Sequence, residues 1–438
     1  MPKGSAFRRL LGLLLLVGLI AGGARAQGVR ELGMGGVYLP GLASADQNPA
    51  FAAIGDPYRY TTWTLPLGAL GLFLPDRSPL YYFTDPEAFY SHFDLLSFYD
   101  QLRHPATFLF NPARSPEEVV IEIAADRVRV TDGRGNPLRI PASLAAPSPR
   151  VPSLTPPPVI KIPFRIGSAF ASSIGLFVGA ENLSLRPNPA LAGLLAGGAL
   201  EANETYELTA RGTTQTGLTL DFAFALPVPS PPEARVYLGA RGSAFLGLAR
   251  LEGELSYRVF TDADAKPERS ERRSRVFYSR LGDGYGYGAR IDLGLALVNE
   301  AGTFGVGVQN LVGFARWQGT ERVDTPEGTS ERPKTLSYAG FRPAFYLSGA
   351  GYAESEELGR VLLAADLGYD GAIYGHAGAE LSLGPARLRA GLGYQNGLQL
   401  GAGVGLGLGS LKLDLALTGW RSDWDGHLVF GLTAGVGF

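Results

Sequence analysis

The sequence contains no cysteine and only four histidines among its 438 residues. Without cysteine there is no disulfide framework, no thiolate zinc site and no thiol nucleophile. The histidines, His92, His104, His376 and His427, lie far apart and form no His-x-x-x-His pair. No Ser/His or paired-carboxylate constellation accompanies them, so we expect no bound metal, no cofactor and no enzymatic activity.

An excess of one charge is also absent, because 39 Lys and Arg residues nearly balance 41 Asp and Glu residues. A chain this close to neutral lacks the basic footprint of a nucleic-acid-binding protein, so we expect no nucleic-acid partner. The 60 glycines are about twice the usual share, but glycine and proline together stay below the range of structureless chains. The length allows one large domain or two or three average ones.

Long apolar runs are missing except at the amino terminus, where basic residues precede the apolar stretch Leu10–Ala21. A helix of about a dozen residues is too short for the roughly 30 Å hydrocarbon core of a membrane. Ala24 and Ala26 place small residues at both positions that a signal peptidase reads. We therefore predict that residues 1–26 are a signal peptide, cleaved before Gln27, and that the mature chain is exported.

From about residue 203 onward, apolar residues recur at every second position, which predicts strands with one apolar face. In one such segment the apolar face consists of Leu218, Leu220, Phe222, Phe224 and Leu226. Glycine, serine, threonine and charged residues occupy the opposite faces. After Arg250 the apolar residues change parity, which predicts a turn or a β-bulge at that point.

The segments are about 10 to 13 residues long, and a tilted strand of 9 to 11 residues crosses a bilayer. Tight connections, such as Leu383–Ala386 and Gly407–Ser410, alternate with longer polar connections, such as Thr261–Arg273 and Gln318–Lys334. Short turns on one rim and long loops on the other are typical of outer-membrane barrels. The sequence therefore predicts an all-β fold, a transmembrane antiparallel β-barrel.

The alternative is a water-soluble β-sandwich or propeller in which the apolar face forms a core. The small side chains of the opposite faces would not fill a second layer, so a lipid-facing exterior around a hydrated lumen fits better. The last residue, Phe438, lies on the apolar face in phase with Leu428, Phe430, Leu432 and Val436. A terminal aromatic in this phase resembles the signal by which the barrel-assembly machinery recognises its clients.

Two motifs follow the predicted cleavage site, Arg-x-x-Gly-Met-Gly-Gly and Asn-Pro-Ala. They resemble the mature terminus of outer-membrane barrels of the long-chain fatty-acid transporter (FadL-like) superfamily, which includes TraF-like proteins. In that superfamily the segment folds as a hatch inside a fourteen-stranded barrel. The resemblance implies a barrel of about 14 strands, a hatch or plug over residues 27–56, and a gate formed by Arg30, Gly33, Met34, Gly35, Gly36, Asn48, Pro49 and Ala50.

The motifs also have a local explanation. Asn caps helices and Pro suits the first helical position, while clustered glycines permit close backbone packing. The position directly behind a signal peptide and ahead of a barrel pattern favours the family resemblance.

The alternating pattern is interrupted near the amino terminus. We assign residues 57–84 to the first barrel strands, residues 85–158 to an inserted subdomain and residues 159–438 to the main barrel. Within the insertion, an amphipathic helix is predicted over residues 85–102, and strand pairs around Gly-rich turns predict a small hairpin over residues 128–140. A proline-rich connector follows.

Charged residues on the predicted inner faces are the candidates to line the lumen and bind ligand: Arg241, Arg290, Asp292, Asp366, His376, Glu380, Arg387 and Arg389. Arg387 and Arg389 could hold a carboxylate headgroup through paired hydrogen bonds. The alternative, which we favour, is that basic and acidic side chains pair across strands and keep the interior polar. His376 lies near Glu380 in sequence, and we expect a structural role for it because no nucleophile accompanies the pair.

These features predict an outer-membrane barrel for passive uptake of hydrophobic or amphipathic small molecules, gated by the N-terminal hatch. Its partners would be the lipid of the bacterial outer membrane, the small-molecule ligand and the barrel-assembly machinery. The alternative function is a non-transporting scaffold, in which the barrel displays residues 85–158 or its long loops to another envelope protein.

Overall fold

The computed structural model describes residues 28–41, 44–55, 58, 63–65, 67–71, 74, 85, 101, 104, 106–110, 120–123, 128–131, 158–166, 170–195, 199–280, 282, 284–339, 343–355, 359–395, 397–421 and 428–437. The predicted signal peptide with Ala24 and Ala26, most of the predicted helix over residues 85–102, and the terminal Phe438 lie outside this part of the chain. Among the described residues, no helix has the length and apolar character needed to cross a membrane.

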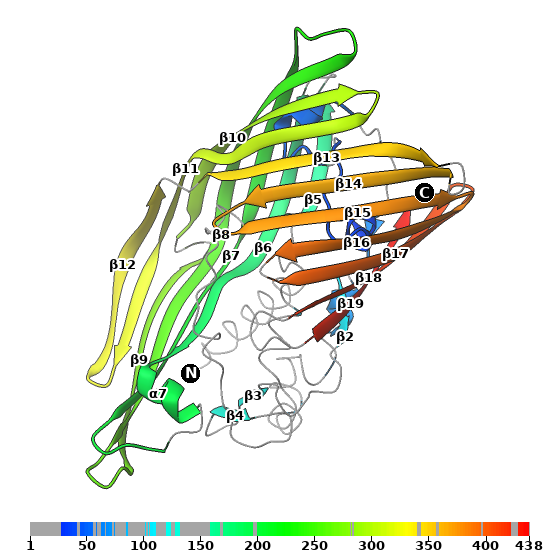
Figure 1. Cartoon of the computed structure of the whole chain (residues 1–438). Helices are drawn as coiled ribbons and strands as arrows, with labels where there is room; N and C mark the ends of the chain where they lie inside the picture. Colours follow the sequence, from blue (N-terminus) through cyan, green and yellow to red (C-terminus); the bar gives the residue numbers. More distant parts are fainter. Residues whose placement is uncertain are drawn as a thin grey trace.

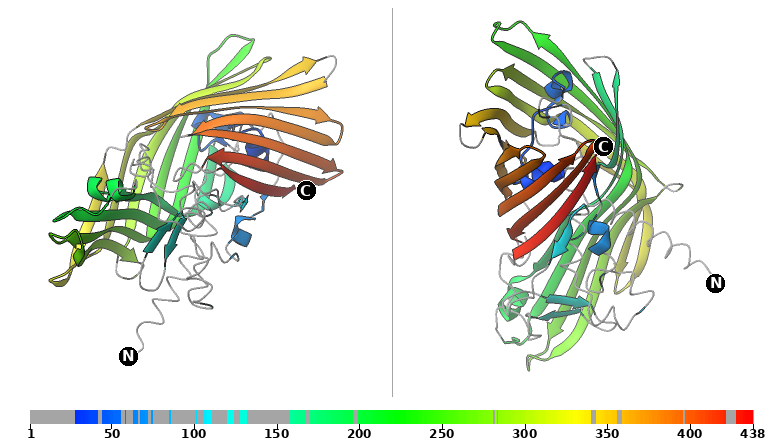
Figure 2. Two further views of the ribbon diagram at one scale, coloured as in Figure 1. Left: turned by 60° about the horizontal axis from the view of Figure 1, so that its bottom comes forward. Right: turned by 90° about the vertical axis from the view of Figure 1, so that its right-hand side faces the viewer.

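In the described part of the chain, antiparallel strands, most of them long, form one sheet of seventeen strands. The wall strands are β5 (Pro158–Ile166), β6 (Phe170–Pro187), β7 (Thr205–Val228), β8 (Ala234–Thr261), β10 (Gly286–Asn299), β11 (Gly302–Thr325), β13 (Ala344–Ser355), β14 (Gly359–Tyr369), β15 (Ile373–Leu383), β16 (Ala386–Gln395), β17 (Leu398–Leu408), β18 (Leu411–Arg421) and β19 (Leu428–Gly437). Each wall strand pairs with the next, and the short strands β1 (Trp63–Thr64) and β2 (Phe108–Phe110) pair with β19. The sheet curls around the N-terminal segment (Figures 1 and 2).

The predicted all-β, antiparallel fold is confirmed. Besides the wall strands, β1 and β2, the described sheet includes β9 (Pro267–Arg280) and β12 (Gly328–Ala339), which pair with the far ends of wall strands. The barrel of about 14 strands stays a prediction. In residues 57–84 the described elements are β1 and the short helix α3 (Gly68–Gly71). The division of the chain into domains stays a prediction.

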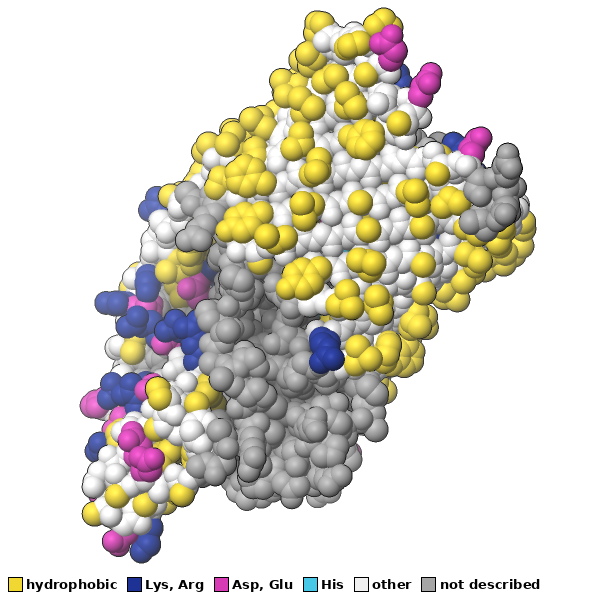
Figure 3. Space-filling view, in the orientation of Figure 1, with side chains coloured by type: hydrophobic (Ala, Val, Ile, Leu, Met, Phe, Trp, Pro, Cys, Tyr) yellow, Lys and Arg dark blue, Asp and Glu magenta, His cyan; other side chains and the backbone are white. Residues whose placement is uncertain are grey.

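The wall strands turn their apolar side chains outward. On β18, Leu413, Leu415 and Leu417 are 41%, 52% and 49% exposed, whereas the alternate residues Asp414, Ala416 and Thr418 are buried. Figure 3 shows the same band of apolar side chains spread over β10 to β18. A contiguous apolar surface of this size is rare on soluble proteins and matches the lipid-facing band of a transmembrane barrel.

A β-bulge lies where the parity of the apolar residues changes. In the β7–β8 ladder Gly217 pairs with Gly247 and Thr216 pairs with Ala249, which leaves Leu248 as an extra residue. The extra residue moves the outward face of β8 from even-numbered to odd-numbered positions beyond it. The bulge predicted near Arg250 is confirmed.

The polar connections predicted at Thr261–Arg273 and Gln318–Lys334 are mostly strand, so the prediction of long loops there was wrong. β8 continues to Thr261 and pairs with β9, and β11 continues to Thr325 and pairs with β12. Both hairpins project beyond the apolar band (Figures 1 and 3). The outer strands of the two hairpins, β9 and β12, carry mostly polar, exposed residues and therefore lack the apolar alternation that marks the wall. We call these two hairpins the outer arms.

Only the first arm of the hairpin predicted over residues 128–140 lies in the described part of the chain. β3 (Val120–Ile123) pairs with β4 (Val128–Thr131) in a separate two-stranded sheet. The predicted first arm, Val128–Val130, therefore pairs with the segment before it, whereas residues 132–140 lie outside the described part.

The outer arms are held by a carboxylate that accepts bonds from several cations. Glu321 on β11 is 1% exposed and accepts hydrogen bonds from Lys334 and from both Nε and Nη2 of Arg332 (2.8 and 2.6 Å). The Arg275 Nε atom lies 3.8 Å from the same carboxylate. The hydrogen bond from Lys334, followed in importance by those from Arg332, holds the pKa of the Glu321 carboxyl below its ordinary value.

We predict that a lysine at the middle of the lipid-facing band destabilises the protein strongly. Leu415→Lys should lower the free energy of unfolding in lipid vesicles by about 2–4 kcal/mol, whereas Leu428→Lys, at the end of β19, should cost about 0–1 kcal/mol. Denaturant unfolding in vesicles measures both values. In a soluble protein the two exposed sites would each change stability by less than about 0.5 kcal/mol, and that result would contradict a membrane-spanning wall.

We predict that the β11–β12 arm loosens on acidification. Because the pKa of Glu321 is lowered in the folded state, its stabilising effect is complete above the unfolded-state pKa and is lost as the pH falls through the lower, folded value. Amide hydrogen exchange over residues 328–339, corrected for intrinsic rates, should therefore accelerate at acid pH. Glu321→Gln should show fast exchange already at neutral pH and no acid step from this group. Glu331→Gln, a half-exposed control on β12, should keep the wild-type profile.

Candidate functional site

The N-terminal segment lies inside the barrel, and we call residues 28–58 the inner segment. It contains the helix α2 (Val29–Gly33) and the 3-10 helix η2 (Pro49–Ala53). Asn48 caps η2 by accepting a hydrogen bond from the Ala50 amide (3.0 Å), with Pro49 at the first helical position. α2 contacts β16 to β19, and η2 contacts β6, β7, β8 and β10. The inner segment thus bridges distant parts of the wall (Figure 2).

Glycines allow the inner segment and the wall to approach backbone to backbone. Gly35 has a φ of +78°, and a Cβ on it would lie 2.4 Å from the Leu392 amide nitrogen. On the wall, a Cβ on Gly391 would lie 2.1 Å from the Met34 carbonyl oxygen, and one on Gly401 would lie 2.3 Å from the Leu32 carbonyl oxygen. Side chains at these positions would push the segment away, so glycine is required on both sides of the contact.

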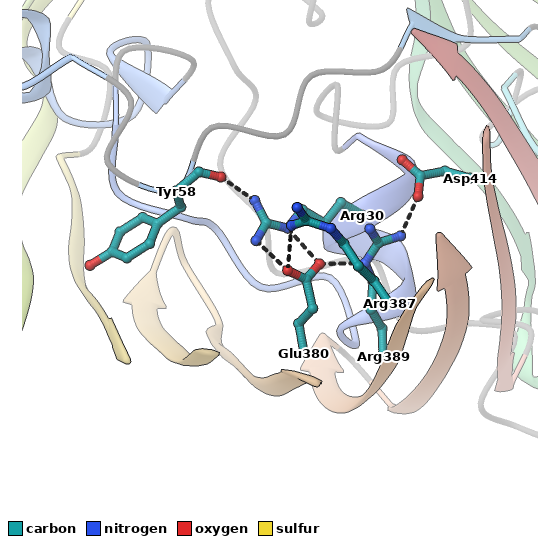
Figure 4. Close-up of polar contacts among 6 residues, drawn as sticks. All are labelled: Arg30, Tyr58, Glu380, Arg387, Arg389 and Asp414. Atoms are coloured by element: carbon teal, nitrogen blue, oxygen red, sulfur yellow. Dashed lines mark hydrogen bonds and ion pairs between the residues drawn. The ribbon is translucent and has the colours of Figure 1, made fainter. Parts of the chain in front are cut away.

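A buried group of ion pairs ties α2 to the wall (Figure 4). Arg30 donates from Nε and Nη2 to the two oxygens of Glu380 on β15 (2.9 and 2.7 Å), and from Nη1 to the Tyr58 carbonyl. Glu380 also accepts from Arg389 Nε (2.6 Å) and Arg387 Nη1 (3.2 Å), both on β16. Arg389 Nη1 donates to Asp414 on β18 (2.6 Å). Glu380 therefore joins three arginines from two separate parts of the chain.

A second group of hydrogen bonds holds the part of the inner segment between α2 and η2 against the wall. Asp366 on β14 accepts a hydrogen bond from the Tyr38 amide (2.8 Å), and its other oxygen lies 2.8 Å from His376 Nδ1. The Gln309 side chain donates to the carbonyls of residues 46 and 47, both at 3.3 Å. His376 thus contacts Asp366, across the ladder from it, rather than Glu380.

A third group lies where β11 bulges. Asp292 on β10 is fully buried; it accepts from Arg241 Nε (2.8 Å) and from the Asn310 amide (2.7 Å). Arg290 donates to the Asn310 side chain (3.4 Å). Asn310 adopts a φ of +56° at the point where the β10–β11 register shifts. The bulge turns the Asn310 amide toward the lumen, where the carboxylate receives it.

An aromatic cluster lines the inner face between η2 and the outer arms. Its members are Phe177, Phe245, Phe277, Ala315 and Trp317. Trp317 lies flat on the wall, because a Cβ on Gly247 or Gly286 would come within 2.4 Å of its ring. The Arg250 guanidinium lies over the rings of Trp317 (5.5 Å) and Tyr338 (5.2 Å).

The structure places the predicted lumen residues in these three groups. Glu380, Arg387 and Arg389 surround Arg30; Asp366 pairs with His376; Arg241 and Arg290 flank Asp292. The sequence analysis left Tyr38, Tyr58, Asn310 and Asp414 out of the candidate residues. Among these four, Asp414 carried a signal, because strand parity turns it inward.

Among the described residues, no group of three or more His, Asp or Glu side chains is arranged to hold a metal ion. The carboxylates are engaged by arginines, backbone amides and hydroxyl groups instead. This arrangement suits a polar, interlocked contact between two parts of one chain.

No family model matches the chain, and no curated protein matches it. Among solved structures it is similar to the toluene transporter TbuX of Ralstonia pickettii, at 12% identity and a TM-score of 0.36, over 63% of this chain and 78% of that one. It is similar to the beta domain of the Bordetella autotransporter BrkA, at 17% identity and a TM-score of 0.25, over 54% and 99%. A mutant porin of Rh. blastica gives 8% identity and a TM-score of 0.21, over 53% and 99%. The assignment of a transmembrane barrel rests on the strands and outward leucines of this chain.

We predict that Gly35→Ala displaces the inner segment. The left-handed backbone alone costs an alanine about 1–2 kcal/mol, and crowding against the wall adds about 1–3 kcal/mol. Gly55→Ala is the matched control, because Gly55 has a φ of +76° and nothing within 4 Å of its Cβ position. Amide hydrogen exchange over residues 29–39 should therefore be roughly tenfold faster or more in Gly35→Ala than in Gly55→Ala. Equal rates in the two variants would contradict the close contact.

Proposed function

We propose that this protein is an outer-membrane barrel for passive uptake of hydrophobic or amphipathic small molecules, and that the inner segment is its gate. One observation carries the proposal: the inner segment fills the space between opposite walls and is held there by hydrogen bonds and ion pairs. Contacts of this kind exchange without breaking covalent bonds, so the segment can have a seated and a displaced state.

The two sides of the inner segment differ in chemistry. Toward the outer arms, the aromatic cluster around Trp317 is buried, so an apolar molecule reaches its rings only when the neighbouring side chains move aside. The lumen beside α2 is polar. In the proposed route, an apolar molecule enters between the arms, rests against the aromatic cluster and passes when the inner segment is displaced. The charged groups of the lumen keep the path hydrated once the segment has moved.

We place the protein in the bacterial outer membrane. The leucine-rich exterior supports insertion into lipid, and tight turns such as Leu383–Ala386 would face the periplasm, as in other barrels. In this proposal residues 1–26 direct export and are removed, and Phe438 is read by the barrel-assembly machinery. The motif residues Arg30, Gly33, Met34, Gly35, Gly36, Asn48, Pro49 and Ala50 form the gate.

Glu380→Gln tests the gate. The substitution leaves Arg30, Arg387 and Arg389 facing an uncharged amide, and breaking a buried ion pair costs about 3–5 kcal/mol. We predict that the variant conducts ions in planar bilayers at least about tenfold more than the wild type. Asp221→Asn is the matched control, because Asp221 is an inward carboxylate that accepts hydrogen bonds from Ser173 and Ser243, both on the wall.

Uptake is measured in cells of a Gram-negative host that lacks its own hydrophobic-uptake barrel. Expression of the wild type should raise the initial rate of uptake of a radiolabelled eight-carbon ketone several-fold above empty vector, and Glu380→Gln should raise it further. Rates equal to the vector for both proteins would contradict a transport function. If, in addition, an envelope protein copurifies with the barrel and this copurification is lost when residues 85–158 are deleted, the scaffold function replaces the transport function.

A further inference from the structure

Three cations converge on one carboxylate in the outer arms. Glu321 accepts hydrogen bonds from Arg332 and Lys334 on β12, and the Arg275 Nε atom on β9 lies 3.8 Å from it. Because opposite residues of a ladder share one face of a sheet, Glu321 lies on the same face as Phe277 of the aromatic cluster. This group therefore lies on the inner face of the arms and carries two positive charges in excess.

The neighbouring ion pairs do not compensate this excess. Glu254 lies opposite Arg275 in the β8–β9 ladder, but it accepts a hydrogen bond from Arg211 (3.0 Å). Glu271 on β9 is itself shared by two arginines of the same strand, at 3.4 and 3.7 Å. Figure 3 shows Lys and Arg side chains gathered at the outer arms, beyond the apolar band. The inner face of the arms is therefore locally electropositive.

The two arginines of this group are open to solvent. The side chains of Arg275 and Arg332 are 65% and 70% exposed, whereas Glu321 beneath them is buried. Arg332 donates to Glu321 from Nε and Nη2, which leaves Nη1 for another acceptor. Arg275 donates no hydrogen bond to any residue in the described part of the chain, so its planar fork of donors is available to a ligand.

The stability of the arm does not account for the third cation. Arg332 and Lys334 already donate hydrogen bonds to Glu321, and at 3.8 Å Arg275 adds none. Exposed ion pairs contribute little to stability, and like charges that are held close together repel each other. Without a ligand the three cations are therefore poorly compensated, and an anion placed between Arg275 and Arg332 would relieve their repulsion.

We propose that Arg275, Arg332 and Lys334 form a binding site for a phosphoryl group. A phosphate monoester carries a charge of about −1.5 to −2 at neutral pH and has three acceptor oxygens, which matches the local excess of two positive charges. Guanidinium forks bind such oxygens in pairs. A carboxylate or a sulfate monoester carries one negative charge and would leave the other positive charge unmatched. The site goes beyond the proposed uptake function and does not depend on it.

The test compares methyl phosphate with methyl sulfate, which have the same shape and differ by one charge. Isothermal titration calorimetry of the purified full-length protein in neutral detergent, at about pH 8 where the phosphate monoester is dianionic, measures binding. Methyl phosphate should bind more tightly than methyl sulfate. Arg275→Gln should weaken methyl phosphate binding about tenfold or more, because hydrogen bonds between charged groups are lost. Arg322→Gln is the matched control and should change nothing, because Arg322 is an exposed arginine of β11 that donates to Asp324 (3.0 Å).

Two further probes identify the source of the phosphoryl group. Tighter binding of octyl phosphate than of methyl phosphate, with protein-free micelles as the blank, would support an amphiphile with a phosphate headgroup. Inorganic phosphate that binds as tightly as both would support free phosphate as the ligand. Methyl sulfate binding as tightly as methyl phosphate, or equal affinity in the wild type and Arg275→Gln, would overturn the site. Because uptake is measured in cells with an uncharged ketone, failure of the site and failure of the uptake function are distinguishable.

Discussion

Charges that lie inside a membrane barrel need opposite charges beside them, and this constraint decides how the inner segment sits. Arg30 lies near the amino terminus and Glu380 lies on a strand 350 residues later, yet each charge compensates the other where both side chains are buried. The cost of burying either alone holds α2 against β15 to β18. The ion pairs around Asp292 likewise compensate buried charges within the wall. They lie at the bulge where β11 stops pairing with β13 and begins to pair with β12.

Alternate residues of the same wall strands meet lipid on one face and the inner segment on the other. Outward leucines such as Leu415 meet lipid, and inward glycines such as Gly391 and Gly401 leave room for another backbone. Where the inner segment is absent, toward the outer arms, Trp317 and its neighbours lie flat over inward glycines instead. The high glycine content of the chain is therefore explained by what the lumen holds, since a barrel lined with larger side chains would have no room for an N-terminal segment.

Much of the fold could be predicted from the alternation of apolar and polar residues along the strands. Much of the site could not. Alternation in segments such as Leu411–Arg421 identifies the wall and places Glu380 and Arg389 on its inner face, and the parity change near Arg250 locates a bulge. The outer arms escaped prediction because their outer strands, β9 and β12, carry mostly polar residues and have no apolar period. The Arg30–Glu380 pair escaped prediction because it depends on where the inner segment lies against the wall, and a single sequence does not contain that information.

The most direct measurement of the gate uses a disulfide, which the cysteine-free chain makes possible. Ala50 of the inner segment and Ala296 of β10 belong to one buried cluster, and cysteines at both positions would tie the segment to the wall when oxidised. The account predicts that the oxidised double variant takes up no radiolabelled probe, that reduction restores uptake, and that neither single variant responds to oxidation. Unchanged uptake by the fully oxidised protein would contradict the claim that the inner segment must move for a molecule to pass.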